Sequence, residues 1–197
     1  MPTSKAIAEL LHEHEIILKV VGNLEGLANT LREHQQVEVA VLREAAAFMR
    51  NFADKCHHAK EEDLLFPALV AAGLPERNGP VAVLKSEHVQ ARSCIAKLAT
   101  AIDAYEHQGS ALRAQIIEAI SCIGELYPQH IAKENEVLFP MSERLLTPVV
   151  LDDLAQKFEG VEEALGKNEH HRWAAVAERL GQQACRAKPE GTDNAPR

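Results

Sequence analysis

The stretch HHAKEEDLLFP at residues 57–67 returns, little changed, as HIAKENEVLFP at residues 130–140. Each copy is preceded by a Glu-His pair. The first histidine of the copy follows His14 by 43 residues in one case and follows His88 by 42 residues in the other. The chain therefore contains two copies of one two-helix unit, and each copy carries a histidine on its first helix and an HxxxE motif on its second.

Apolar residues recur at helical spacing along these predicted helices. Around His14 they fall at Ile7, Leu10, Ile17 and Val21. The stripe predicts that this histidine faces the interior of the protein rather than solvent.

The periodicity and the helix breakers together predict long helical runs at about residues 3–32, 37–66, 81–107 and 111–146. Proline lacks the amide donor, and its ring collides with the preceding helical turn. We therefore expect Pro67 to stop or bend the second run. Pro140 meets the fourth run at the matching place.

Long helical runs joined by short connections predict an all-α protein. We expect residues 1–146 to form an up-down-up-down antiparallel four-helix bundle. Thr147 followed by Pro148 indicates the start of the first of two short additional C-terminal helices, which should pack on the bundle within residues 147–184. Residues 185–197 are polar and contain Pro and Gly, so we expect this tail to be disordered.

Composition narrows the classes of partner. The 197 residues carry a net charge of -8 and no cluster of Lys and Arg, which argues against nucleic-acid binding. There is no apolar run of the roughly 18 residues that a membrane span requires, and the N-terminus does not have the pattern of a signal peptide. We therefore expect no membrane association and a cytoplasmic location.

The cysteines do not form a recognisable pattern. Cys56, Cys94, Cys122 and Cys185 are scattered along the chain without a CxxC pair. This spacing indicates neither a disulfide framework nor a thiolate zinc site, and we expect reduced thiols.

The HxxxE motifs place two different ligand types on one helix face. Residues four apart share a face, so His57 and Glu61 can reach one point in space, as can His130 and Glu134. Burying four histidines and two carboxylates together without a metal would cost several kcal/mol for each charge. With His14 and its counterpart in the second copy, the set matches the ligand inventory of a two-iron site.

The first copy contains two overlapping HxxxE frames, one beginning at His57 and the other at His58. Alignment of the two LFP tails places Ile131 opposite His58 and Asn135 opposite Glu62. These substitutions are incompatible with a symmetric ligand role for the second frame, so the repeat selects the frame that begins at His57.

HHAKEEDLLFP and HIAKENEVLFP, each preceded by a helix with a Glu-His pair, resemble the hemerythrin-like, or HHE cation-binding, domain over about residues 6–145. The resemblance implies a non-haem di-iron site with an oxo or hydroxo bridge inside the bundle, and manganese is a possible alternative metal. It implies four terminal ligands and two bridging ligands, namely His14, His57, His88 and His130, and Glu61 and Glu134.

The sequence departs from the respiratory carriers of this family, which place a second histidine four residues after the one on the third helix. Here that position is Arg92. Both irons would then be five-coordinate, and open positions favour reaction or sensing over simple carriage. Arg92 could balance charge near the site. Tyr127, three residues before His130, could reach a bound oxygen species, although a core packing role is equally expected.

The resemblance and the open positions predict a protein that binds or senses a small oxidant, such as dioxygen, nitric oxide or peroxide. One alternative is a di-iron enzyme for catalase-like peroxide removal or repair of iron centres. A second alternative is an iron-storage or iron-level sensing module. Ferritin-like proteins carry a Glu-x-x-His pair on each of two helices, whereas here the only such pair, Glu9 and His12, has no counterpart in the second copy of the repeat. Ferroxidase chemistry is therefore ranked lower. The sequence does not identify a protein partner.

Overall fold

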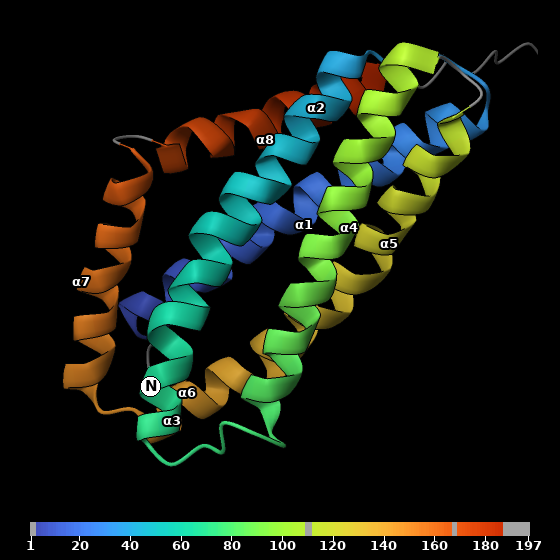
Figure 1. Cartoon of the computed structure of the whole chain (residues 1–197). Helices are drawn as coiled ribbons and strands as arrows, with labels where there is room; N and C mark the ends of the chain where they lie inside the picture. The colour runs from blue at the N-terminus through green and yellow to red at the C-terminus, as the bar shows by residue number, and fades with distance from the viewer. Residues whose placement is uncertain (1–2, 109–111, 167–168, 187–197) are drawn as a thin grey trace, which may run out of the picture.

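A computed structural model describes residues 3–108, 112–166 and 169–186, and this part of the chain folds into helices without strands. The helices form four long rods that lie side by side, with two further helices against them (Figure 1). Residues 185 and 186 are helical, and the rest of the tail predicted to be disordered lies outside the described residues.

Two of the four rods are single helices and two are composite. The single helices are α1 (Lys5–Arg32) and α4 (Pro80–Gln108). The second rod runs through α2 (Val39–Phe48), the π-helical segments η1 (Met49–His58) and η2 (Glu61–Leu65), and α3 (Phe66–Ala71). The fourth rod runs through α5 (Arg113–Lys133), the π-helical segment η4 (Glu134–Leu138) and α6 (Phe139–Leu145). Helix α5 packs on both α1 and α4, and the second rod packs on the same two helices from the other side.

The rods do not end at the two prolines that follow the repeated motif. Of the two outcomes expected at Pro67, a stop or a bend, the stop does not occur, because that rod continues to Ala71. Proline cannot donate a hydrogen bond, and its ring crowds the carbonyl four residues earlier. The helix accommodates this by widening, so that the amide of Phe66 donates to the carbonyl of Glu61, five residues earlier. The same widening precedes Pro140 in the second copy.

Capping residues fix several helix ends where the sequence predicts them. The hydroxyl of Ser4 accepts a hydrogen bond from the amide of Ile7 at 3.4 Å and caps α1. The hydroxyl of Thr147 accepts from the amide of Val150 at 3.4 Å and caps α7 (Pro148–Leu165). Helix α7 ends at Gly166, whose φ of 130° is accessible to glycine but rarely to other residues.

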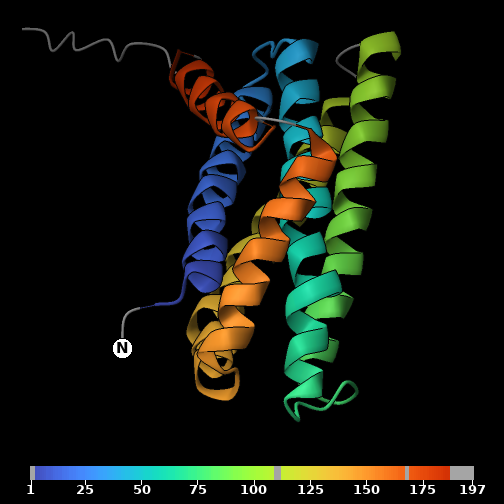
Figure 2. The same cartoon turned by 90° about the vertical axis from the view of Figure 1, so that its left-hand side faces the viewer.

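The two C-terminal helices cover part of the rods. Helix α7 contacts α1 and the π-helical segments, while α8 (Glu169–Arg186) crosses α1 and α2 (Figure 2). Helix α7 buries Phe158, and α8 buries Trp173, which meets Phe48 of α2 edge to face with ring centroids 6.1 Å apart.

Helix α7 is also tied to the rods by a buried cation. The ammonium group of Lys60 is fully buried and donates to Glu9 and Glu13 of α1, each at 2.6 Å, and to Glu162 of α7 at 2.7 Å. A buried charge is tolerated only when it is paired and hydrogen-bonded. These three carboxylates meet that requirement and fix α7 against α1.

The hydrophobic core consists of two clusters along the rods. One is built around residues such as Ile17, Phe52 and Ile123, and the other around Leu10 and Phe66. Between them lies a layer of buried polar side chains, namely Glu13, His14, His57, His58, Lys60, Glu61, His88, His130 and Glu134. A polar layer this deep in an apolar core requires a functional explanation.

Cys94 of α4 and Cys122 of α5 form a disulfide, with their Cα atoms 5.8 Å apart. The prediction of reduced thiols is wrong for this pair and holds for Cys56, which is free and buried. The sequence separation of 28 residues carries no signal for the bond. The pairing follows instead from the way the two antiparallel helices face each other.

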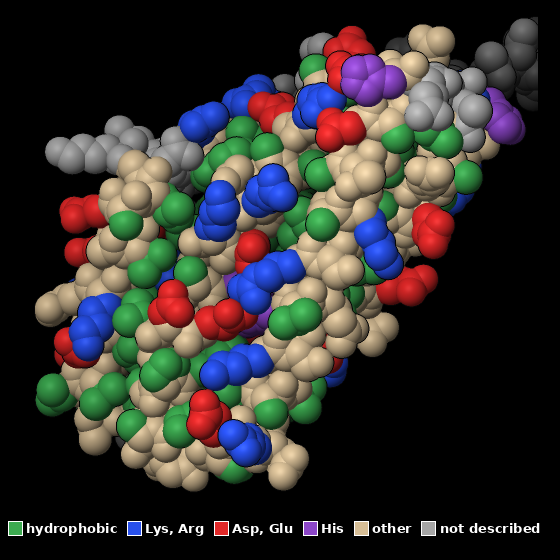
Figure 3. All heavy atoms as spheres, in the orientation of Figure 1, with side chains coloured by type: hydrophobic (Ala, Val, Ile, Leu, Met, Phe, Trp, Pro, Cys, Tyr) green, Lys and Arg blue, Asp and Glu red, His purple; other side chains and the backbone are tan. Residues whose placement is uncertain are grey.

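Two observations bear on charged and membrane partners. On the face in Figure 3, acidic and basic side chains are interspersed rather than gathered into a patch of one sign. Within the described part of the chain, none of the helices combines the length and the hydropathy needed to cross a bilayer.

Candidate metal centre

The six residues singled out in the sequence lie together in the polar layer, each at most 2% exposed. They form two overlapping groups, and in each group the candidate ligand atoms lie within 4.8 Å of one another. One group contains His14 and His57, and the other contains His88 and His130. Both groups share the carboxylates of Glu61 and Glu134.

In the first group, the Nε2 atoms of His14 and His57 are 2.9 Å apart. His14 Nε2 lies 3.1 Å from Oε2 of Glu134, and His57 Nε2 lies 3.7 Å from Oε2 of Glu61. Two imidazoles and one oxygen from each of two carboxylates therefore face one point.

The second group repeats this arrangement. The Nε2 atoms of His88 and His130 are 3.1 Å apart. His130 Nε2 lies 3.2 Å from Oε1 of Glu134, and His88 Nε2 lies 3.4 Å from Oε2 of Glu61. Glu134 presents Oε2 to the first group and Oε1 to the second, so its carboxylate lies between the two groups.

The other ring nitrogen of each histidine is held by an oxygen acceptor. Within each copy of the repeat, the glutamate of the Glu-His pair takes this role. Glu13 accepts from Nδ1 of His57 at 2.8 Å, and Glu87 accepts from Nδ1 of His130 at 3.0 Å. A neutral imidazole that donates through Nδ1 has its lone pair on Nε2, so these bonds aim an unprotonated nitrogen into the site.

Each of the remaining two histidines is held by an acceptor from the other copy of the repeat. Asn135 Oδ1 accepts from Nδ1 of His14 at 2.7 Å, and Glu62 Oε1 accepts from Nδ1 of His88 at 2.6 Å. The sequence analysis assigned no role to the four acceptors. Their positions nevertheless match in the two copies of the repeat. Glu13 and Glu87 each precede the histidine of a Glu-His pair, and Glu62 and Asn135 each follow the glutamate of an HxxxE motif.

Basic side chains pair with the outer carboxylates. Lys133 contacts Glu87 as Lys60 contacts Glu13. Arg92, whose side chain is 39% exposed, donates from Nη2 to Glu62 at 2.9 Å. Its proposed role in balancing charge near the site remains a prediction.

The inner groups require a cation. The carboxylate oxygens of Glu61 and Glu134 accept no hydrogen bond from the described residues, although both side chains are fully buried. Burial alone would lower the pKa of His88, but the nearby carboxylates of Glu134 and Glu61 outweigh it and raise the pKa to about 11. Positive charge is thus strongly favoured between the carboxylates, and a metal ion can supply it. The donor set of imidazole nitrogens and carboxylate oxygens fits iron or manganese.

Tyr127 lies beside the site, fully buried, with its ring centroid 6.5 Å from that of His130. Its hydroxyl makes no hydrogen bond within the described part of the protein. The proposal that this phenol reaches a bound oxygen species remains a prediction.

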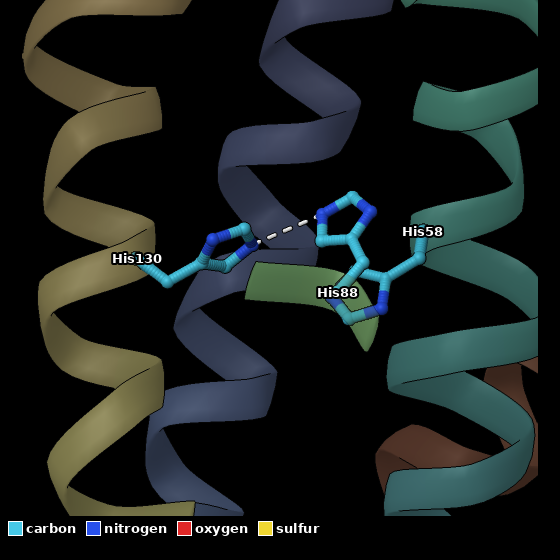
Figure 4. Close-up of side chains that lie close together, drawn as sticks. All are labelled: His58, His88 and His130. Carbon is cyan, nitrogen blue, oxygen red and sulfur yellow. Dashed lines mark hydrogen bonds between the residues drawn. The ribbon is translucent and has the colours of Figure 1, made fainter. Parts of the chain in front are cut away.

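His58 also lies in the polar layer, where sequence reasoning did not place it. Its ring stacks on that of His88, with centroids 3.8 Å apart, and Figure 4 shows the rings of His58, His88 and His130 approaching from three rods. A π-helix turns less per residue than an α-helix. The π-helical segment η1 therefore lets the adjacent residues His57 and His58 both face inward.

Comparisons with known proteins agree with this geometry. Uncharacterized proteins from Mycobacterium bovis (Mb2018) and Mycobacterium tuberculosis (Rv1995) are each 24% identical to the chain over 154 residues, which is 78% of this chain and 60% of theirs. The chain thus spans less than two thirds of the length of these relatives. No solved structure matches the chain. The profile of the family described as "Hemerythrin HHE cation binding domain" matches residues 5–142, and the chain belongs to that family.

Proposed function

We propose that the protein holds a pair of iron ions in an up-down-up-down four-helix bundle and binds or senses a small oxidant there. In this proposal His14 and His57 hold one ion, His88 and His130 hold the other, and Glu61 and Glu134 bridge them. The observation that carries the proposal is that two groups of buried ligand atoms share both carboxylates.

The surroundings of the site support binding of a small molecule. Phe139 stacks on the ring of His14 with centroids 5.3 Å apart, and Phe66 stacks on that of His88 at 5.7 Å. Together with the two apolar clusters, these rings exclude bulk water and leave no room for a large substrate. When bound, an iron pair supplies open coordination positions and redox chemistry for a small oxidant.

A sensing role is supported by the contact between the site and an outer helix. One oxygen of Glu13 accepts from His57, and the other accepts from Lys60, which also binds Glu162 of α7. A change in the position of His57 therefore alters the contacts that hold α7. The chain of contacts offers a route by which the state of the site reaches the surface.

Catalase-like peroxide removal is the second candidate function. It is favoured by the free hydroxyl of Tyr127, which lies in the wall of the site and could hydrogen-bond a peroxide oxygen.

Metal analysis and a peroxide assay test the proposal. Protein purified without oxygen should contain about two irons per chain and should gain near-ultraviolet absorption from iron charge transfer on exposure to air. A Glu61→Ala variant should lose both features. Oxygen release from peroxide that depends on Glu61 would favour the enzyme, whereas a reversible spectral change without turnover would favour binding or sensing. Wild-type protein that takes up no iron would refute both.

A further inference from the structure

We infer that His58 is a third histidine ligand of the ion held by His88 and His130, so that the two metal positions are chemically different. The inference rests on the proposed metal pair and adds a ligand that the repeat does not predict. One ion would have three histidines and the other two.

The first argument is burial without a partner. His58 is 1% exposed, and neither of its ring nitrogens makes a hydrogen bond within the described part of the protein. An unsatisfied buried polar group is costly and requires an explanation. One ligand atom from each of His58, His88 and His130 lies within 4.8 Å of the other two, which is compatible with coordination of one ion.

The second argument is the orientation of the ring. Nδ1 of His58 lies 3.5 Å from Oδ1 of Asp54, and Asp54 is held by Arg92 at 2.7 Å. The other four histidines also point Nδ1 at an oxygen behind them and Nε2 at the metal position. A small shift of Asp54 would complete the same pattern, with Nε2 of His58 as the ligand atom.

The third argument is that His58 faces only one of the two positions. Its ring centroid is 3.8 Å from that of His88 and 5.8 Å from that of His57. The second copy has Ile131 at the matching place, so the ion held by His14 gains no third histidine. That ion therefore keeps the open position, and a small ligand should bind there.

A His58→Phe variant tests the inference, because phenylalanine preserves the stacking on His88 but has no ligand nitrogen. Phe52→Leu is the matched control, since it changes a fully buried ring in the same π-helical segment as His58 and removes no proposed ligand. Both variants would be loaded with isotopically enriched iron and compared by Mössbauer spectroscopy, competitive chelator titration and azide titration.

Wild-type protein and the Phe52→Leu variant should show two distinct quadrupole doublets of equal area and bind one azide per iron pair. In His58→Phe one doublet should move towards the other, and a second azide should bind. One of the two irons should also bind more weakly. Loss of a residue that only holds a ligand in place typically lowers metal affinity about 10- to 100-fold, so loss of a ligand should lower it by at least that much.

Unchanged doublets and iron affinity in the His58→Phe variant would overturn the inference and leave His58 as a packing partner of His88. Two equivalent irons in the wild-type protein would overturn the inference without any variant. This measurement therefore tests the inference even if His58→Phe does not fold. A wild-type protein with no iron pair would instead refute the proposed function, so the two failures are distinguishable.

Discussion

Glu13→Gln and Glu87→Gln form a matched pair of changes that separates the stability of the protein from its affinity for metal. Both glutamates hold the Nδ1 atom of a proposed ligand histidine, and both contact a lysine. They differ in burial. Glu13 and its partner Lys60 are fully buried, whereas the side chain of Lys133 beside Glu87 is 46% exposed.

The difference in burial sets the expected magnitudes. Removing one partner of a buried ion pair costs about 3–5 kcal/mol, whereas an exposed pair contributes about 0–1 kcal/mol. Lys60 keeps two other carboxylates, so we take the lower value, about 3 kcal/mol, for Glu13→Gln. For a chain of this size that loss corresponds to a decrease in Tm of about 6–12 °C. Glu87→Gln should lower Tm by only a few degrees.

Metal affinity should behave differently. Each change weakens the acceptor that orients one histidine, so each should reduce the affinity for iron by about 10- to 100-fold. Thermal unfolding of the metal-free proteins and chelator competition on the loaded proteins measure the two effects separately. Equal losses of stability in the two variants, or unchanged iron affinity in both, would refute the reasoning.

Three further predictions concern the whole protein. Chelation should lower Tm, because binding of an interior metal is coupled to folding, and an unchanged melting curve after verified metal removal would count against a buried site. Iron affinity, followed with a chromophoric chelator, should rise with pH. The metal-free site raises the pKa of His14 and of His88, so binding must displace protons, and an affinity independent of pH would contradict this. Phe158→Ala should destabilise the protein by about 3–5 kcal/mol in chemical denaturation, because Phe158 is fully buried under α7. Val149→Ala, at a position 78% exposed, should change stability by less than about 0.5 kcal/mol, and a similar loss in both variants would show that α7 does not dock as described.

The sequence predicted the helices well where the signals are local. Thr147 caps the helix that it was expected to begin, and the run predicted from about residue 3 begins at Lys5 after its cap, Ser4. The expected stop at Pro67 does not occur, because a helix can absorb a proline by widening into a π-helical turn. The prediction of reduced thiols failed for Cys94 and Cys122, since their bond depends on how two helices face each other rather than on their spacing in the chain.

The candidate ligands were predictable because the chain repeats them. The same repeat also marks the acceptors Glu13 and Glu87, which precede His14 and His88 at matched positions of the two copies. His58 was not predictable in this way. The repeat argues against a symmetric role for it, and the inward direction of its ring depends on the π-helical geometry of η1.

The two copies differ in the side chains that surround one of the two proposed ions. Four polar side chains, Asp54, His58, Glu62 and Arg92, are replaced at the matched positions of the other copy by Tyr127, Ile131, Asn135 and Leu18. The four form one connected group, since Arg92 binds both Asp54 and Glu62, Asp54 faces His58, and Glu62 holds His88. Arg92 is then not merely the residue that replaces a carrier's histidine. It holds the two carboxylates that lie beside His58 and His88, and we propose that this connected group as a unit makes the two metal positions different.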